Sequence, residues 1–126
     1  MNHRVLIIED NEQNLYLLTF LLTRNGYVVD SAMEGPSGIE KARLCVPDLI
    51  LLDIQLPVMD GYAVAKVLRE QPELATVPIV AVTSYAMPGD KERALASGCT
   101  GYIEKPINPE TFLSQIEVYF SEDTGR

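Results

Sequence analysis

The sequence predicts an α/β fold in which five strands of a parallel sheet alternate with five helices. Short apolar runs recur five times, and a helical pattern follows each one. The run at Leu49–Asp53 is apolar up to its last residue, as a strand covered by helices on both faces requires. Glycine, proline and asparagine separate the segments. Strands and helices that alternate in this way form a sheet with right-handed crossovers.

The expected strands are Arg4–Ile8, 27–29, Leu49–Asp53, 78–82 and Gly101–Glu104. The first helix begins after Asn11, a favoured N-cap, and runs to about Arg24 before Asn25-Gly26. The other helices are expected from Gly35 to before Pro47, over 62–70, from a start at Pro88-Gly89-Asp90 to about Ala96, and from Pro109 with Asn108 as its cap. This order favours a three-layered, flavodoxin-like sandwich with strand order 2-1-3-4-5.

The apolar patterns of three helices predict which of their side chains face the core or a partner. On the first helix Leu15, Leu18, Thr19 and Leu22 share one face, while Leu17 and Phe20 point the other way. The second face is either ordinary surface or a docking face for a partner helix. The remaining apolar positions expected are Ile39, Ala42, Leu44 and Cys45 on the second helix and Phe112, Leu113, Ile116, Val118, Tyr119 and Phe120 on the last.

Length and composition favour one soluble domain. The 126 residues suffice for one ordinary core, which we expect over 4–120 with a short polar tail at 121–126. No apolar run approaches the ~20 residues of a membrane span, and the apolar run at the start ends after four residues in two acids, unlike a signal peptide. The net charge of −8 argues against nucleic-acid binding.

The two cysteines indicate the compartment. Cys45 and Cys99 have no metal-site spacing and are too few for a disulfide framework. We expect both to be buried or half-buried thiols of a protein in a reducing compartment, the cytoplasm.

Polar residues end four of the five apolar runs, and they define a candidate site. In the predicted order these strands are neighbours, and the ends of parallel strands meet at one edge of the sheet. We therefore expect the side chains to converge. The residues are Glu9, Asp10, Asp53, Thr83, Ser84 and Lys105.

The chemistry of this set favours a magnesium-assisted phosphoryl site. Three carboxylates ~4 Å apart repel by about 4 kcal/mol per pair at an effective dielectric of ~20, so a cation must offset them. A few hard oxygen ligands without histidine or cysteine suit Mg²⁺. Lys105 adds a fixed positive charge and Thr83 a hydroxyl donor, which together accommodate a phosphoryl group on Asp53.

These stretches identify the chain as similar to the response-regulator receiver domains of two-component signalling. The matching segments are VLIIEDNEQN, PDLILLDIQLPVMDG, IVAVTSYA and GCTGYIEKPI, and the wording EDNEQN and DIQLP is similar to DivK-type regulators. The resemblance covers the chain from Val5 to Phe120. It implies a phosphoacceptor that assists its own phosphorylation and dephosphorylation, without separate substrate turnover.

The resemblance also implies a role for each site residue. Asp53 would accept the phosphoryl group from a histidine kinase or histidine phosphotransfer protein. Lys105 would pair with a phosphoryl oxygen, and a cis peptide bond between Lys105 and Pro106 would hold the ammonium in place. Thr83 and Tyr102 would form a switch that, with the segment 85–95, reports to a downstream protein target across the fourth helix, fifth strand and fifth helix. The magnesium ligands would be Glu9, Asp10, Asp53 and the main-chain carbonyl of Gln55.

Three alternatives remain distinct from this interpretation. A haloacid-dehalogenase-type phosphatase needs an acid two residues after the nucleophile, where this chain has Gln55. A nucleotide or flavin binder needs a glycine-rich loop after the first strand, where Glu9 and Asp10 would repel phosphate. A scaffold that is independent of phosphorylation would not need the full set of site residues.

We also predict that bulky Tyr85 slows hydrolysis of the acyl phosphate.

Overall fold

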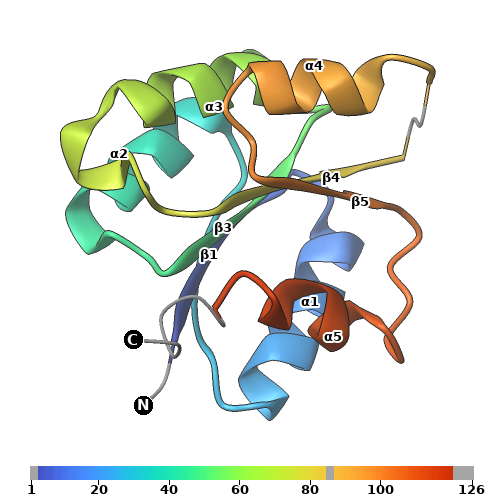
Figure 1. The fold of residues 1–126 in the computed structure, drawn as a ribbon. Helices are drawn as coiled ribbons and strands as arrows, with labels where there is room; N and C mark the ends of the chain where they lie inside the picture. The colour runs from blue at the N-terminus through green and yellow to red at the C-terminus, as the bar shows by residue number, and fades with distance from the viewer. Residues whose placement is uncertain (1–2, 85–86, 121–126) are drawn as a thin grey trace.

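The structure, a computed structural model, describes residues 3–84 and 87–120, and it has the predicted α/β architecture (Figure 1). The strands are β1 Arg4–Ile8, β2 Val28–Ala32, β3 Leu49–Asp53, β4 Ile79–Thr83 and β5 Gly101–Glu104. The α-helices are α1 Glu12–Arg24, α2 Gly35–Cys45, α3 Gly61–Glu70, α4 Asp90–Ala96 and α5 Phe112–Glu117, and a short 3₁₀ helix, η1, spans Pro72–Leu74.

The five strands form one parallel sheet in the order β2-β1-β3-β4-β5, which confirms the predicted topology. The register aligns the strand ends: Ile8 lies opposite Leu52, Asp53 opposite Val82, and Thr83 opposite Glu104. The carboxyl ends of β1, β3, β4 and β5 therefore lie along the same edge of the sheet.

Helices cover both faces of the sheet, with α2, α3 and α4 on one side and α1 and α5 on the other (Figure 1). All five residues of β3 are buried, as the apolar run at the centre of the sheet predicted. On the α1 and α5 side, the residues that contact the sheet include Leu18, Leu22, Phe112 and Ile116. The two faces give two cores, and the central strands contribute side chains alternately to each.

The second strand differs from the prediction of 27–29. It begins at Val28 and extends to Ala32, because each of its residues pairs with a residue of β1. As an edge strand it has a solvated side, so it tolerates polar side chains in its interior. Asp30, one of these, forms an ion pair with Arg4 of β1 at 2.7 Å.

The last helix begins later than predicted. The Asn108 side chain accepts a hydrogen bond from the Glu110 N–H at 2.9 Å, and its carbonyl accepts from the Thr111 and Phe112 N–H groups. These bonds form turns ahead of α5, so the helix itself starts at Phe112. Val118 lies beyond its end and is 59% exposed, outside the predicted apolar face.

The predicted burial of the second helix is also wrong at its end. Leu44 and Cys45 are exposed, whereas Gly38 and Ala42 face the sheet. A Cβ at position 38 would lie 2.5 Å from Ile8 Cδ1, so glycine allows α2 to approach β1 closely. That contact fixes the rotation of α2 and turns Leu44 and Cys45 outward. Cys99 is buried, as expected.

None of the helices within residues 3–84 and 87–120 has the length and apolar character to cross a membrane.

Candidate functional site

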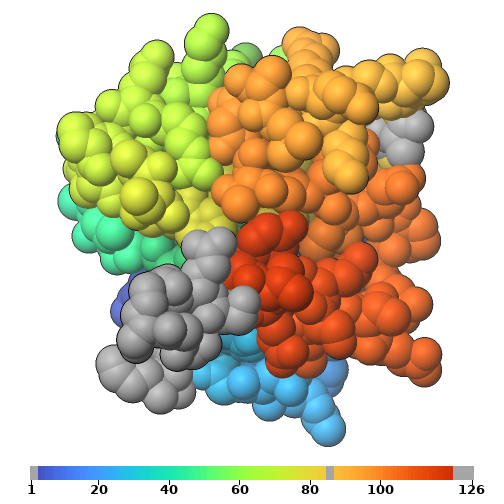
Figure 2. All heavy atoms as spheres, in the orientation of Figure 1, coloured from blue at the N-terminus to red at the C-terminus, as the bar shows by residue number. Residues whose placement is uncertain are grey.

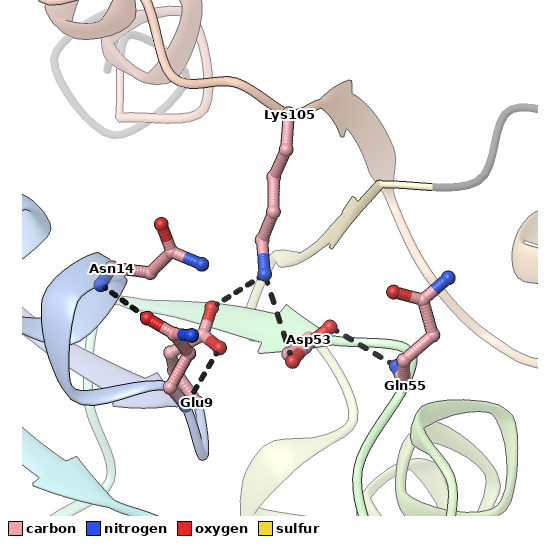
Figure 3. Close-up of polar contacts among 6 residues, drawn as sticks. Glu9, Asn14, Asp53, Gln55 and Lys105 are labelled. Carbon is pink, nitrogen blue, oxygen red and sulfur yellow. Dashed lines mark hydrogen bonds and ion pairs between the residues drawn. The ribbon is translucent and has the colours of Figure 1, made fainter.

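The acid-bearing strand ends converge as the sequence predicted (Figure 3). Glu9 directly follows β1, Asp53 ends β3, and Thr83 ends β4. All three side chains are buried, with at most 3% of their surface exposed. A burial this complete is costly for carboxylates unless cations or donors surround them.

The turn that starts α1 fixes the Glu9 carboxylate. Asn11 caps the helix, as predicted, because its Oδ1 accepts a hydrogen bond from the Asn14 N–H at 2.9 Å. The Asn11 N–H in turn donates to Glu9 Oε2 at 3.1 Å. The helix cap therefore holds one oxygen of Glu9 in place and leaves the other directed into the site (Figure 3).

Lys105 reaches into the site from the end of β5. Its peptide bond to Pro106 is cis, as predicted, and its N–H donates to the Thr83 carbonyl at 2.8 Å. The Lys105 Nζ lies 2.9 Å from Glu9 Oε1 and 3.7 Å from Asp53 Oδ2. The ammonium therefore faces Asp53 as predicted, but it is closer to Glu9.

Asp53 is held at the entrance to the loop that leads to α3. Its Oδ1 accepts a hydrogen bond from the Gln55 N–H at 3.0 Å. The loop returns close to the strand at Gly61, where a Cβ would lie 2.6 Å from the Asp53 carbonyl oxygen. Burial raises the pKa of Asp53, and the Glu9 carboxylate acts in the same direction. The Gln55 N–H and the Lys105 ammonium favour the charged form but do not outweigh burial.

The three acids fit a divalent cation. One carboxylate oxygen from each of Glu9, Asp10 and Asp53 lies within 4.8 Å of the others, and Asp10 is more accessible than its two neighbours. Glu9 Oε1 is buried and accepts no hydrogen bond from the described residues, although the Lys105 ammonium is nearby. The single positive charge of that ammonium offsets only part of the charge of the three acids. The acidic cluster is therefore compatible with Mg²⁺, a hard cation with oxygen ligands.

A cavity of about 280 Å³ opens over these acids. Besides the three acids it is lined by Gln55, Ser84 and Lys105, which the sequence also predicted, and by Asn11 and Asn14. Asn14 was expected only as a helix residue. The signal that could have located it is its spacing, four residues after Asp10 and in the first turn of a helix that begins at the site.

The predicted switch residues lie apart from this cavity. Thr83 lines an adjoining cavity of about 350 Å³ between α3 and α4, together with Gln55, Tyr62 and Arg93. Tyr102 is half-buried and lies opposite Ala81, two residues before the end of β4. Tyr85 lies outside the described residues, so its effect on hydrolysis stays a prediction. The coupling of Thr83 and Tyr102 also stays a prediction.

Comparison with known proteins agrees with this geometry. Residues 5–117 match the family described as the response regulator receiver domain. The chain belongs to this family. It is also 42% identical to the polar-differentiation response regulator DivK of Brucella ovis over 122 residues, which cover 97% of this chain and 99% of DivK. The sequence resemblance to receiver domains and to DivK-type regulators is thereby confirmed.

Solved structures support the same assignment. The chemotaxis protein CheY4 of Vibrio cholerae superposes with a TM-score of 0.90 at 31% identity, covering 94% of this chain and 99% of CheY4. The receiver domain of the sensor histidine kinase PA1611 from Pseudomonas aeruginosa superposes with a TM-score of 0.89 at 30% identity, covering 96% and 99% of the two chains. That structure has a magnesium ion coordinated in its active-site cleft. The chain is thus a receiver domain of two-component phosphorelay signalling.

Proposed function

We propose that this receiver domain accepts a phosphoryl group on Asp53 from a phosphohistidine on a histidine kinase or a histidine phosphotransfer protein. The observation that carries the proposal is the buried carboxylate of Asp53, with the Lys105 ammonium 3.7 Å away and two further acids beside it. We propose further that residues 1–126 form one receiver domain with its core at 4–120. Its compartment would be the cytoplasm.

The transfer is a displacement at phosphorus. An Asp53 carboxylate oxygen forms the new P–O bond while the P–N bond of the donor breaks, and the electron pair of that bond stays on the imidazole nitrogen. Lys105 holds a positive charge where the phosphoryl oxygens gather negative charge. The Gln55 N–H keeps one Asp53 oxygen fixed, so the other is directed toward the ammonium.

The acids would hold Mg²⁺ through the side chains of Glu9, Asp10 and Asp53, with the Gln55 carbonyl as a further ligand. When bound, Mg²⁺ supplies positive charge that offsets the repulsion between these carboxylates and the incoming phosphoryl group. The charge balance supports this assignment, because the three acids carry more negative charge than the Lys105 ammonium beside them offsets.

The domain is an acceptor whose product is its own phosphorylated form, and the message passes by protein contact. Phosphorylation adds roughly −1.5 to −2 charge, which draws the Thr83 hydroxyl and Lys105 toward Asp53 and turns Tyr102 inward. Figure 2 displays α4 and β5 in orange directly against α5 in red. A hollow of about 520 Å³ runs between them, lined by residues that include Met87, Tyr102 and Gln115. This face suits a downstream target.

The phosphodonor docks along α1, the helix that begins beside the acids. Tyr16 and Phe20 are exposed there, 73% and 45%, and their rings stack with centroids 6.4 Å apart. The Arg24 guanidinium lies over Phe20 at 5.6 Å. An exposed aromatic and cationic stripe of this kind is suited to a partner helix.

Incubation with a small phosphodonor and Mg²⁺ tests the proposal. Intact-mass measurement should detect one added phosphoryl group in the parent and none in Asp53→Asn, and chelation of the metal should prevent the reaction in the parent. Asp48→Asn is a matched control, because Asp48 is exposed and precedes β3, at the opposite end of that strand from Asp53. A parent that takes up no phosphoryl group would instead be a scaffold that acts without phosphorylation.

A further inference from the structure

We propose that Asn14 contacts the departing group of the phosphoryl donor and gives the site a preference for nitrogen-linked donors over acyl phosphates. This inference rests on the proposed function, because it assigns a residue to the transfer onto Asp53. It defines Asn14 as a residue that selects the donor and plays little part in the later lifetime of the phosphoryl group.

The backbone of Asn14 is fixed while its side-chain amide is available. Its N–H donates to Asn11 Oδ1 at 2.9 Å in the cap of α1. Within residues 3–84 and 87–120 no hydrogen bond engages the amide group of the side chain, which is half-buried and lines the cavity over the acids. A half-buried amide with an unused donor and acceptor, on a rigid helix turn, is positioned to bind a ligand.

The position of Asn14 determines which part of the phosphoryl donor it can contact. In Figure 3 the Asn14 amide lies on the α1 side of the Lys105 ammonium, and Asp53 lies on the other side. The phosphorus atom of the donor must come within bonding distance of Asp53. Asn14 lies on the far side of Lys105 from Asp53, so it can contact only the part of the donor that is farther from Asp53. That part is the leaving group, which enters from the solvent side of the cavity.

The chemistry of the cavity favours an amide for this contact. The charged groups that line it are the carboxylates of Glu9, Asp10 and Asp53 and the ammonium of Lys105, whereas the Asn14 amide is neutral. A protonated phosphoimidazole carries a hydrogen on its second ring nitrogen, and the Asn14 amide oxygen can accept it. When the P–N bond breaks, the ring keeps the electron pair and departs as neutral imidazole with that N–H intact. The acetate released from acetyl phosphate has no N–H to donate.

Truncation of Asn14 should not disturb folding. The Asn11 cap uses the backbone N–H of Asn14, which every substituent except proline retains. Alanine is also a better helix former than asparagine. Gln13→Ala is the matched control, because Gln13 is exposed on the same helix turn and does not line the cavity.

The test compares monophosphoimidazole with acetyl phosphate as donors, with Mg²⁺ present, by the fraction of phosphorylated protein in intact-mass spectra over time. The readout is the ratio of the two second-order rate constants. Asn14→Ala should lower this ratio about tenfold, the effect expected from loss of one hydrogen bond. Asn14→Asp, which keeps an acceptor oxygen, should lower both rate constants by repulsion but should not lower the ratio below that of the parent. Gln13→Ala should match the parent throughout.

Dephosphorylation separates this role from a structural one. The lifetime of phosphorylated Asp53 should change less than twofold in Asn14→Ala, because imidazole has left by then. An unchanged ratio in Asn14→Ala, or an equal fall with both donors, would overturn the inference. A parent that accepts phosphoryl groups from neither donor would overturn the proposed function instead.

Discussion

The two ends of the sheet differ in how their charged side chains are paired. At the amino ends of β4 and β5, the Arg69 guanidinium donates to the carbonyls of Gly98, Leu74 and Val77 at 2.8, 3.0 and 2.6 Å, and to Thr100 Oγ1 at 2.9 Å. At the carboxyl ends, Glu9 and Asp53 share the Lys105 ammonium at 2.9 and 3.7 Å, and Asp10 lies beside them.

The difference separates a stabilising charge from a functional one. Arg69 joins the ends of α3 and α4 to the starts of two strands, and its hydrogen bonds satisfy carbonyls that would otherwise lack donors. The three acids carry more negative charge than Lys105 offsets, so they are suited to a cation from outside the chain. We therefore expect changes at the Arg69 end to alter stability, and changes at the acidic end to alter ligand binding.

The largest expected effect is on thiol reactivity. Burial raises the pKa of Cys99, beside Arg69, from 9.0 to about 11, whereas Cys45 is exposed. Because the thiolate is the reactive form, alkylation at pH 8 should modify Cys45 at least ~100-fold faster than Cys99. Peptide mapping after timed quenching measures both rates. Equal rates would mean that the Arg69 end opens readily.

The same shift has a consequence for stability. The folded state holds the Cys99 proton at pH values where the unfolded chain has lost it, so the free energy of unfolding should fall as pH rises from 9 to about 11. Cys99→Ala removes the group, and urea unfolding across that range should then show a smaller decline than in the parent.

Loss of Arg69 should be the most destabilising of the substitutions considered. Arg69→Met keeps the apolar stem but removes the donors of several buried carbonyls, so we expect a loss of about 3 kcal/mol in the free energy of unfolding. Lys66→Met, an exposed position on the same helix, should change it by less than about 0.5 kcal/mol. Urea unfolding measures both. Magnesium affinity should stay within twofold in Arg69→Met, and a larger fall would contradict the separation of the two ends.

Magnesium should stabilise the acidic end by a similar amount. At a concentration about 100-fold above Kd, binding to the folded state alone adds about 2.7 kcal/mol. Asp10→Asn removes one ligand charge and should weaken binding at least ~10-fold, while relief of repulsion keeps the metal-free protein as stable as the parent or more so. Titration calorimetry and thermal unfolding with and without a chelator test both statements. A metal-free Asp10→Asn protein less stable than the parent would make Asp10 structural.

The sequence predicted most of the fold and the site because both depend on strand ends. A strand buried on both faces must be apolar, so an acid at its end is conspicuous, and a parallel sheet gathers such ends at one edge. The sequence alone therefore predicted that Asp53, Glu9 and Lys105 lie together.

The missed features depend on packing that local patterns do not specify. Cys45 is exposed because the contact of Gly38 with Ile8 fixes the rotation of α2. Helix α5 starts later than predicted because Asn108 forms turns with the residues that follow it. Asn14 was missed as a site residue because the direction of a helix side chain toward a cavity depends on how the helix sits against the sheet.

The smallest expected effects concern backbone strain, which both ends carry. Val46, at the end of α2, has φ 43°, and Val58, in the loop after Asp53, has φ 68°, and both are exposed. A β-branched residue is unfavourable in the left-handed region, whereas asparagine tolerates it. Val46→Asn and Val58→Asn should each raise the free energy of unfolding by about 0.5–1 kcal/mol. Neither side chain lines the acidic cavity, so magnesium affinity should stay within twofold in both. If only Val58→Asn weakened magnesium binding, strain beside Asp53 would be part of the metal site, and the distinction between the ends would extend from charge to backbone conformation.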